Sequence, residues 1–237
     1  MEIIGTLESC YKDKFGTPRQ PGLAPSSWAC LRIRKEWQPE IALQGLDGFS
    51  HLWILFQFHQ NTNQGYHAKV HPPRLGGKPI GVFATRSPHR PNNLGLSLVK
   101  IEKIDGDSIF LSGVDLVDGT PVLDIKPYLP EVESIPNANS GWTGEATQAE
   151  IEIKWTERQK QFVENWSLRI HQPQLLQLIE ETLKLDPRPL VYRGYEGTES
   201  PYRKIHAVRL FDGDIHFEFV QSQVIEIRDI RVANNEM

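Results

Sequence analysis

Cysteine is scarce in this chain, with only Cys10 and Cys30 among 237 residues. Two cysteines are too few for the disulfide scaffold that holds many small secreted proteins together. They stand far apart in the sequence, and neither has the Cys-x-x-Cys or Cys-His spacing of a zinc ligand set. We therefore expect neither a disulfide framework nor a bound metal.

Long apolar segments are missing as well. The longest runs, such as residues 52–56, are far shorter than the roughly 20 residues that a membrane helix needs. The N-terminal sequence MEIIGTLES is typical of a strand and has none of the basic and apolar regions of a secretory signal. The sequence therefore predicts a globular, cytoplasmic protein that contacts no membrane.

An excess of basic residues is also lacking, since the formal net charge is −4. Bulk charge therefore does not predict a nucleic-acid-binding protein, and no contact with DNA is expected. Contact with RNA would need a local cationic patch. Three sets of residues qualify: Arg86 with Arg90; Lys69 with Arg74 and Lys78; and Arg188, Arg193, Arg203 and Lys204.

Common nucleotide-binding motifs are absent. No Gly-rich loop ends in Gly-Lys-Ser or Gly-Lys-Thr, and the pair Gly76-Gly77 lies in RLGGKPIG rather than in a dinucleotide fingerprint. A nucleotide cofactor would therefore not be bound on a Rossmann sheet.

The N-terminal part shows many short strand patterns between clusters of Gly, Pro and Asn. The predicted strands are residues 3–7, 30–33, 52–58, 80–83, 96–104 and 108–114. The last two form a hairpin across Asp105-Gly106-Asp107, where we expect a type I′ turn because Asp-Gly supplies positive φ. Many short strands in about 140 residues indicate a sandwich or a barrel.

The pattern changes beyond a stretch rich in Asn, Ser and Gly at 136–144, so we expect domains at 1–145 and 146–237. Thr156 and Gln159 form a capping-box signature for one helix. A second helix should begin near Gln172, bury Leu175, Leu176, Ile179 and Leu183, and end before Asp186-Pro187. A hairpin of 205–210 and 215–220 follows, with its turn at Asp212-Gly213. The fold class is therefore α+β, with a smaller α+β domain at the C-terminus.

Candidate functional side chains are densest between residues 80 and 128. Arg86, His89 and Arg90 lie in a loop rich in Pro and Asn, which fixes the backbone and displays polar groups. Further along, Asp115, Asp118 and Asp124 precede Lys126 and Tyr128 in an extended segment. Outside this span, His59 ends a predicted strand and is a candidate site residue, whereas His51 is expected to be a buried, hydrogen-bonded histidine.

Several long motifs resemble those of the TsaA-like family. They are PRQPG at 18–22, GFSHLWILFQFHQ at 48–60, PPRLGG at 72–77, GVFATRSPHRPNNLGLS at 81–97 and DLVDGTPVLDIKPYLP at 115–130. The resemblance extends to DPRP and Tyr192-Arg193, so it covers nearly the whole chain. Motifs of this length are highly specific.

This resemblance implies a small single-sheet β-barrel methyltransferase that uses S-adenosylmethionine. It also implies a homodimer with the cofactor near the subunit interface. The implied substrate is a tRNA anticodon stem-loop, and the reaction is methylation of N(6) of threonylcarbamoyl-adenosine at position 37, next to the anticodon of a threonine tRNA. The implied cofactor contacts are Pro18, Arg19, Gln20, His59, Gln60, Arg86, Leu96, Leu116, Val117, Asp118, Gly119 and Thr120.

The chemistry of these residues suits the cofactor. The guanidinium groups of Arg19 and Arg86 can pair with its carboxylate, and Asp118 can accept hydrogen bonds from ribose or amine groups. Two alternatives stay open: Arg86 pairs with a nearby aspartate, and Arg19 is a surface charge.

Asp124, Lys126 and Tyr128 would share one face of an extended segment and are the predicted catalytic residues. The reacting nitrogen is conjugated to a purine and a carbonyl, so the reaction needs a general base or a donor that polarises the carbamoyl oxygen. Asp124 or Tyr128 would be that base, and Lys126 would stabilise negative charge. The alternative is a buried Asp-Lys pair that holds the loop.

The C-terminal domain combines cations with aromatic residues, as RNA-binding surfaces do. Arg188, Tyr192 and Arg193, together with Arg90, are the predicted substrate contacts, and Tyr195, Tyr202, Arg203 and Lys204 belong to the same group. Two other functions stay open: a small-molecule methyltransferase or hydrolase, and a non-catalytic module that senses S-adenosylmethionine.

Overall fold

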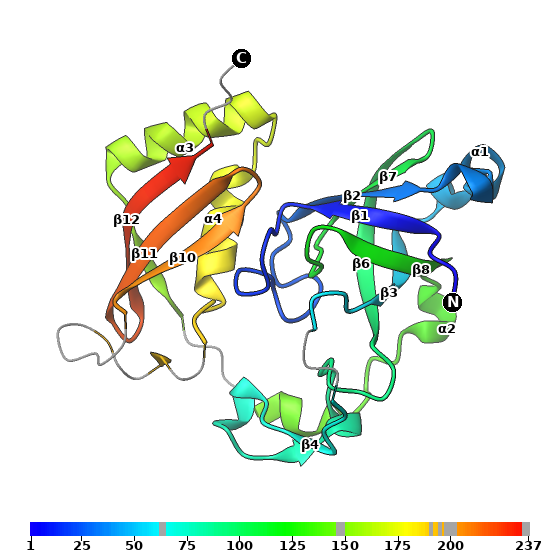
Figure 1. Cartoon of the computed structure of the whole chain (residues 1–237), viewed down its shortest axis with the longest axis horizontal. Coiled ribbons are helices and arrows are strands. Elements are labelled where there is room, and N and C mark those ends of the chain that lie inside the picture. Colours follow the sequence, from blue (N-terminus) through cyan, green and yellow to red (C-terminus); the bar gives the residue numbers. More distant parts are fainter. Residues whose placement is uncertain (62–64, 146–149, 190–191, 194–195, 197–202, 234–237) are drawn as a thin grey trace. The chain divides into compact units, whose positions relative to one another are not determined.

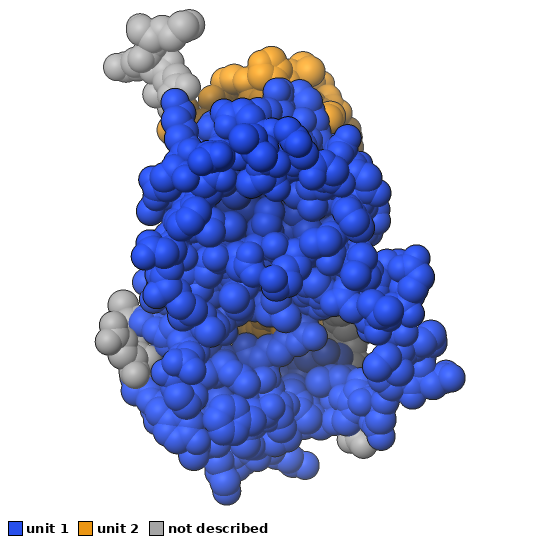
Figure 2. Space-filling view, turned by 90° about the vertical axis from the view of Figure 1, so that its right-hand side faces the viewer, with its two compact units in different colours: residues 1–8, 30–111, 119–148 blue, residues 9–29, 112–118, 149–237 orange. Residues whose placement is uncertain are grey.

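A computed structural model describes residues 1–61, 65–145, 150–189, 192–193, 196 and 203–233. The chain forms two compact units, coloured separately in Figure 2. The first consists of Met1–Glu8, Cys30–Leu111 and Gly119–Gln148, and the second of Ser9–Ala29, Ser112–Asp118 and Ala149–Met237. Two short segments from the N-terminal half thus group with the C-terminal part. A division of the chain at residue 145 stays a prediction.

Strands of the N-terminal half close into a barrel in the order β1-β2-β7-β6-β3-β8 (Figure 1). They are β1 (Gly5–Ser9), β2 (Trp28–Ile33), β3 (His51–Gln57), β6 (Leu94–Asp105), β7 (Ser108–Ser112) and β8 (Thr120–Pro127). In β3, Leu52, Ile54 and Phe56 are buried, and the residues between them are partly exposed. This alternation is expected of strands that bury one face. The predicted single-sheet barrel is confirmed.

One glycine is required by the packing of the barrel interior. A Cβ atom at Gly95 of β6 would collide with the ring of Phe56 on the neighbouring strand β3. Phe56 is only 5% exposed, so its ring has no free space to move into. The glycine thus lets a large aromatic side chain lie flat across the adjacent backbone.

Two local predictions for the barrel are wrong in detail. The hairpin between β6 and β7 is present, but only Gly106 has positive φ (59°) and Asp107 does not. A type I′ turn needs positive φ at both central residues, so a type II′ turn fits better. The strand predicted at 80–83 ends at Gly81, because the N–H of Thr85 turns back to bond the carbonyl of Val82 in a 3-10 helix.

Shorter elements complete this half of the chain. A small hairpin pairs β4 (Lys69–Val70) with β5 (Ile80–Gly81) outside the barrel sheet (Figure 1). The short helices are η1 (Lys35–Trp37), α1 (Pro39–Ala42), η2 (Leu46–Gly48), η3 (Pro73–Leu75), η4 (Val82–Ala84), α2 (Pro130–Glu133) and η5 (Gly141–Glu145).

The second unit contains a sheet in the order β10-β11-β12-β9. Its strands are β9 (Glu152–Lys154), β10 (Ile205–Leu210), β11 (Gly213–Gln221) and β12 (Val224–Val232). β9 runs parallel to β12, whereas the other pairs are antiparallel. The predicted hairpin of β10 and β11 is confirmed, but its turn lies one residue earlier than predicted. Gly213 pairs with Leu210 inside the sheet, and the turn consists of Phe211, which adopts positive φ (52°), and Asp212.

Two helices accompany this sheet. The predicted capping box opens α3 (Glu157–Ile170), where Thr156 and Gln159 bond each other's backbone N–H groups. The second helix, α4 (Leu175–Lys184), begins three residues later than predicted. It buries Leu178, which was not among the predicted buried residues, whereas Leu176 is only half-buried. None of the described helices has the length and apolar character needed to span a membrane.

Residues 9–29 are hydrogen-bonded to the C-terminal sheet within the second unit. The N–H of Phe211 donates to the carbonyl of Cys10 at 2.8 Å, and Tyr11 forms an isolated bridge with Leu210. At the far end of the segment, Ser26 donates its N–H and hydroxyl to the carboxylate of Glu181 on α4. This N-terminal segment therefore belongs structurally with the C-terminal elements.

Candidate cofactor and substrate site

The outer face of the barrel brings together three of the predicted site residues. Strand β3 lies between β6 and β8, so Leu55 is opposite Leu96 on one side and Asp124 on the other. Trp53 is likewise opposite Lys126. A β-bulge at Leu55 shifts the register of β8, and bulges of this kind re-aim side chains next to functional sites. Leu96, Asp124 and Lys126 thus share one surface.

Asp124 and Lys126 form an ion pair with a distance of 3.0 Å between Oδ2 and Nζ. The Asp124 side chain is 44% exposed and that of Lys126 is 74% exposed. The alternative of a buried pair is therefore wrong, because water reaches both groups. An exposed pair contributes little to stability, about 0–1 kcal/mol, so the fold does not depend on it.

Tyr128 lies in an aromatic cluster just after β8. Its ring is edge-on to those of His51 and Trp53, with centroid distances of 6.4 and 6.0 Å. Its N–H donates to the carbonyl of His51. His51 is half-buried rather than buried, and its Nδ1 lies 2.9 Å from the hydroxyl of Ser50.

The loop after η4 is organised by Arg90. Its Nη1 donates to the carbonyls of Val82 (3.2 Å) and Thr85 (2.8 Å), which fixes the turn of η4. Its guanidinium carbon also lies 5.3 Å from the centre of the Phe83 ring. Arg86 in the same loop is exposed. Arg90 therefore stabilises the conformation of the loop that the sequence predicts to bind a ligand.

His59 and Gly119 are neighbours in the first unit. A Cβ atom at Gly119 would lie 3.8 Å from Nε2 of His59, and Gly119 adopts positive φ (77°). Gly119 donates its N–H to the carbonyl of Leu7, and Thr120 is buried. Gln60 is exposed. The structure thus places the imidazole beside a turn whose backbone a ligand can approach closely.

In the second unit, the carboxylate of Asp118 already has partners. Its Oδ1 accepts the N–H of Ser9 at 2.8 Å, and its Oδ2 lies 3.0 Å from Nζ of Lys12. Leu116 is buried and Val117 half-buried. The sequence did not predict the ion pair of Lys12 with Asp118, because no local signal indicates a pairing across more than a hundred residues. A ligand contact by Asp118 would have to share this carboxylate.

The predicted cofactor loop at Pro18, Arg19 and Gln20 lies in the electrostatic field of the C-terminal motif. Burial lowers the pKa of Arg19, the positive charge of Arg193 lowers it further, and the carboxylate of Asp186 opposes both. Pro18 is buried and Gln20 half-buried. Arg19 is itself exposed, so the alternative of a surface charge agrees with the structure, and that charge is influenced by Arg193 and Asp186 within this unit.

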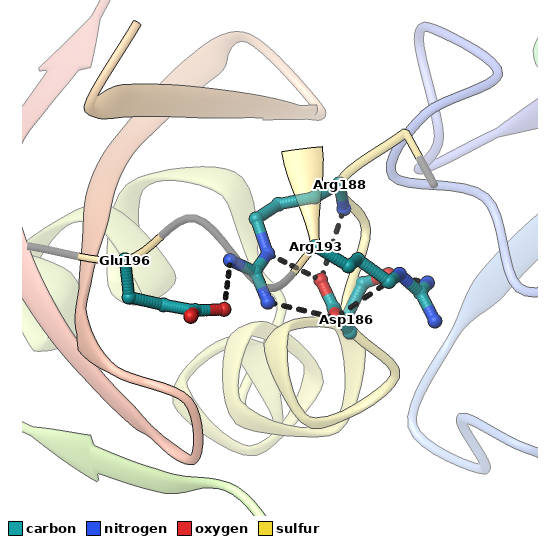
Figure 3. A network of polar contacts seen from close by, with 4 residues as sticks. All are labelled: Asp186, Arg188, Arg193 and Glu196. Atoms are coloured by element: carbon teal, nitrogen blue, oxygen red, sulfur yellow. Dashed lines mark hydrogen bonds and ion pairs between the residues drawn. The ribbon is translucent and has the colours of Figure 1, made fainter. Parts of the chain in front are cut away.

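A network centred on Asp186 holds the predicted RNA contacts (Figure 3). Arg188 binds both oxygens of Asp186, through Nε at 2.9 Å and Nη2 at 3.1 Å, and its Nη1 donates to Glu196. Arg193 donates from Nη2 to the Asp186 carbonyl at 2.8 Å. Arg188 is only 4% exposed and its guanidinium stacks 3.4 Å from the centre of the Phe219 ring. Direct contact of Arg188 with RNA would require this network to open.

Cations and aromatic rings surround the network. Burial, reinforced by the charges of Arg188 and Arg203, lowers the pKa of His206 to about 4. The His206 ring packs edge-on against Tyr192, and Arg203 lies 5.8 Å from the centre of the same Tyr192 ring. Arg203 and Lys204 are exposed. The predicted contacts Tyr195 and Tyr202 fall outside the described residues.

Two family models match this chain. The model for the tRNA-methyltransferase O N-terminal domain matches residues 6–134, and the model for the TrmO C-terminal domain matches residues 148–233. A tRNA (adenine(37)-N6)-methyltransferase of Escherichia coli is 44% identical over 91% of this chain and 91% of its own length. A Pseudomonas aeruginosa protein, named as a candidate S-adenosylmethionine-dependent methyltransferase, is 41% identical over 96% of this chain and 95% of its own.

The solved structures agree with these matches. The crystal structure of TrmO from P. aeruginosa superimposes with a TM-score of 0.80 at 36% sequence identity. The alignment covers 98% of this chain and 95% of that one.

Proposed function

The chain belongs to the TrmO family, and from this premise we propose that it is a tRNA-modifying transferase that methylates N(6) of adenine 37 with S-adenosylmethionine. The observation that carries the proposal is similarity over nearly the full length, through both domain models, to a relative named for this reaction. We propose threonylcarbamoyl-adenosine in the anticodon loop of a threonine tRNA as the substrate. A cytoplasmic location follows from that substrate.

The donor set of the first unit fits the cofactor. S-adenosylmethionine carries a carboxylate, an amine, a ribose, an adenine ring and a sulfonium, and when bound it supplies an electrophilic methyl group. Exposed Arg86 suits the carboxylate, exposed Leu96 offers apolar contact, and exposed Gly119, which has no side chain, lets a ligand approach the turn beside His59. Gln60 and Thr120 complete this set. The contacts predicted for Pro18, Arg19, Gln20, Leu116, Val117 and Asp118 belong to the second unit.

The proposed chemistry needs a base, since the substrate nitrogen is conjugated to a carbonyl and its lone pair is poorly available. Asp124 is the better candidate, because its carboxylate is 44% exposed and therefore open to a substrate. Asp124 would take the proton while Lys126 offsets the negative charge that develops. Tyr128 is the weaker candidate, because its ring packs against His51 and Trp53.

A homodimer is proposed on the outer face of the barrel. Outward-facing positions of a solvated sheet are usually polar. Here Trp53 and Leu55 of β3 face outward beside Leu98 and Leu96 of β6, and Leu96 is 54% exposed. Leu96 is exposed and the other three are half-buried, and together they form an apolar surface beside Asp124 and Lys126 that suits a second copy. Such a dimer would place the proposed chemistry near the subunit interface.

In the C-terminal region, Tyr192, Arg193 and the exposed Arg203 and Lys204 are the proposed contacts with the anticodon stem-loop. The buried Arg188 would act through the network that holds this surface in shape.

The test is nucleoside mass spectrometry on tRNA incubated with the purified protein and S-adenosylmethionine, with and without threonylcarbamoyl-adenosine. A gain of one methyl group on the modified nucleoside alone is the expected result. Methylation of both RNAs would mean that the threonylcarbamoyl group is not required, while the proposed methyltransferase activity would stand. No gain on either RNA, with cofactor binding shown by calorimetry, would favour a small-molecule enzyme or a cofactor sensor.

A further inference from the structure

One long segment of the chain contains no acidic residue. Between Asp47 and Glu102 the sequence has neither Asp nor Glu, although the whole chain has 30 such residues. The same segment contains the six cations Lys69, Arg74, Lys78, Arg86, Arg90 and Lys100, and five of the eight histidines. In a chain with a net charge of −4, this is a local concentration of positive charge. Lys100 pairs with Glu102 at 2.8 Å, whereas Lys69 lies on β4 and Arg90 bonds the carbonyl of Val82 just after β5. Cations gathered at one hairpin in this way attract polyanions.

Two exposed aromatic rings lie side by side within this segment. Phe83 of η4 is 68% exposed and Tyr66 is 53% exposed. Their ring centres are 6.5 Å apart and the ring planes are inclined by 34°. The backbone brings them together, because β4 pairs with β5 and the N–H of Val82 bonds the carbonyl of Ala68. We call Tyr66 and Phe83 the aromatic pair.

Two neighbouring residues, Val82 and Arg90, hold the aromatic pair in place. Val82, next to Phe83, is buried and anchors the turn. Arg90 lies 5.3 Å from the centre of the Phe83 ring and is itself fixed by two backbone carbonyls. The ring nevertheless keeps most of its surface in water. An exposed aromatic surface with a fixed cation is prepared for a ligand rather than buried as core.

We propose that the aromatic pair is a stacking platform for an unpaired base of the RNA substrate, and that cations of residues 48–101 bind the adjacent phosphates. This proposal rests on the proposed function, because an adenine next to the anticodon can be methylated only when it leaves the base stack of its loop. Aromatic side chains that stack on bases, beside cations that follow the backbone, are how proteins bind single-stranded RNA. Phe83 and Tyr66 are the binding residues, and Arg90 is a positioning residue.

The cation beside the aromatic pair argues against a second copy of the chain as the occupant of the pair. A two-fold contact centred there would bring Arg90 of each copy close to Arg90 of the other, and like charges repel. RNA supplies both the stacking bases and the opposite charge.

The test compares full-length variants in their affinity for a synthetic anticodon stem-loop, measured by fluorescence anisotropy. We expect Phe83→Ala to weaken binding by about 5- to 150-fold, the range for losing one stacked base. Phe83→Trp should bind as the wild type does. Phe83→Leu, which keeps apolar bulk without a π-face, should resemble Phe83→Ala and guards against a folding defect. Phe162→Ala is the matched control, because Phe162 is also exposed (43%) but lies on α3.

The outcomes separate this proposal from the proposed function. Wild-type methylation together with unchanged RNA affinity in Phe83→Ala and Phe83→Leu would overturn the platform and leave the enzyme intact. Conversely, RNA binding that depends on Phe83 without any methylation would support the platform and count against the enzyme. If Phe83→Ala instead converted a dimer to a monomer in sedimentation, the aromatic pair would be a contact between copies and the platform would be wrong.

Discussion

Nζ of Lys126 lies 3.0 Å from Oδ2 of Asp124 on the outside of the barrel, at a strand whose register is shifted by a bulge. Both side chains are open to solvent, so the pair contributes little to folding. Exposed pairs with the same spacing occur elsewhere, as at Lys103 and Asp105, so activity rather than stability decides the role of Asp124.

Asp124→Asn tests this role. The amide keeps the shape but cannot take a proton, so we expect kcat for tRNA methylation to fall by roughly 10²- to 10⁴-fold, with the Kd for S-adenosylmethionine unchanged. Asp105→Asn is the matched control, because Asp105 pairs with Lys103 at 2.7 Å in the same two-residue spacing on an exposed strand. Full turnover in both Asp124→Asn and Tyr128→Phe would remove the assigned base.

Gly95→Ala should destabilise the barrel. The added methyl group meets the ring of Phe56, and overpacking of this kind costs about 1–3 kcal/mol or more. Urea denaturation followed by tryptophan fluorescence measures the loss. Gly48→Ala is the control, because no atom lies near its Cβ position and its φ is not positive. Combining Gly95→Ala with Phe56→Leu should recover part of the stability, and no recovery would mean that the clash is not the cause.

Arg188→Ala should be strongly destabilising. The substitution leaves Glu196 without its partner and Asp186 with Arg193 alone, both in half-buried positions, and breaking such a pair costs about 3 kcal/mol. Arg209→Ala removes an exposed pair with Asp214 and should change the unfolding free energy by about 0.5 kcal/mol or less. Similar unfolding midpoints for the two variants would contradict the role assigned to the network. Arg188→Lys should not rescue it, since an ammonium cannot bind both oxygens of Asp186 as the guanidinium fork does.

Stability should fall between pH 6.5 and about pH 4 because of His206. Burial lowers the pKa of this imidazole to about 4 in the folded protein, against 6.5 when it is unperturbed. In that window the unfolded chain binds a proton that the folded chain does not, so lowering the pH favours unfolding; above pH 6.5 the contribution is complete. The melting temperature of His206→Phe should therefore depend less on pH than that of the wild type. His171→Asn, at an exposed position, should follow the wild type, and identical profiles for His206→Phe and the wild type would exclude the effect.

Local features of the sequence predicted the elements whose stability is local. The capping box of Thr156 and Gln159, and the positive φ that Gly106 allows in its turn, depend only on residues within a few positions. The strand prediction was wrong at Val82 and Phe83. There the backbone hydrogen bonds of η4 override the strand propensity of the sequence.

The candidate site was only partly accessible from the sequence. The long motifs pointed to Asp124, Lys126 and the loop around Arg90, because these residues stand close together in the chain. Lys12 and Asp186 were missed as partners of Asp118 and Arg19, since those relations join distant segments.

By itself, the sequence determined the all-β character of the first half, the helices and hairpin of the second, and the family to which both belong. The tertiary structure alone decided that residues 9–29 bond to the C-terminal sheet, that Lys12 pairs with Asp118, and that Tyr66 and Phe83 stand side by side in water. The physical reason is that periodicity and turn chemistry act over a few residues, whereas strand register, ion pairing and exposure depend on which distant segments the closed barrel and the second sheet bring together.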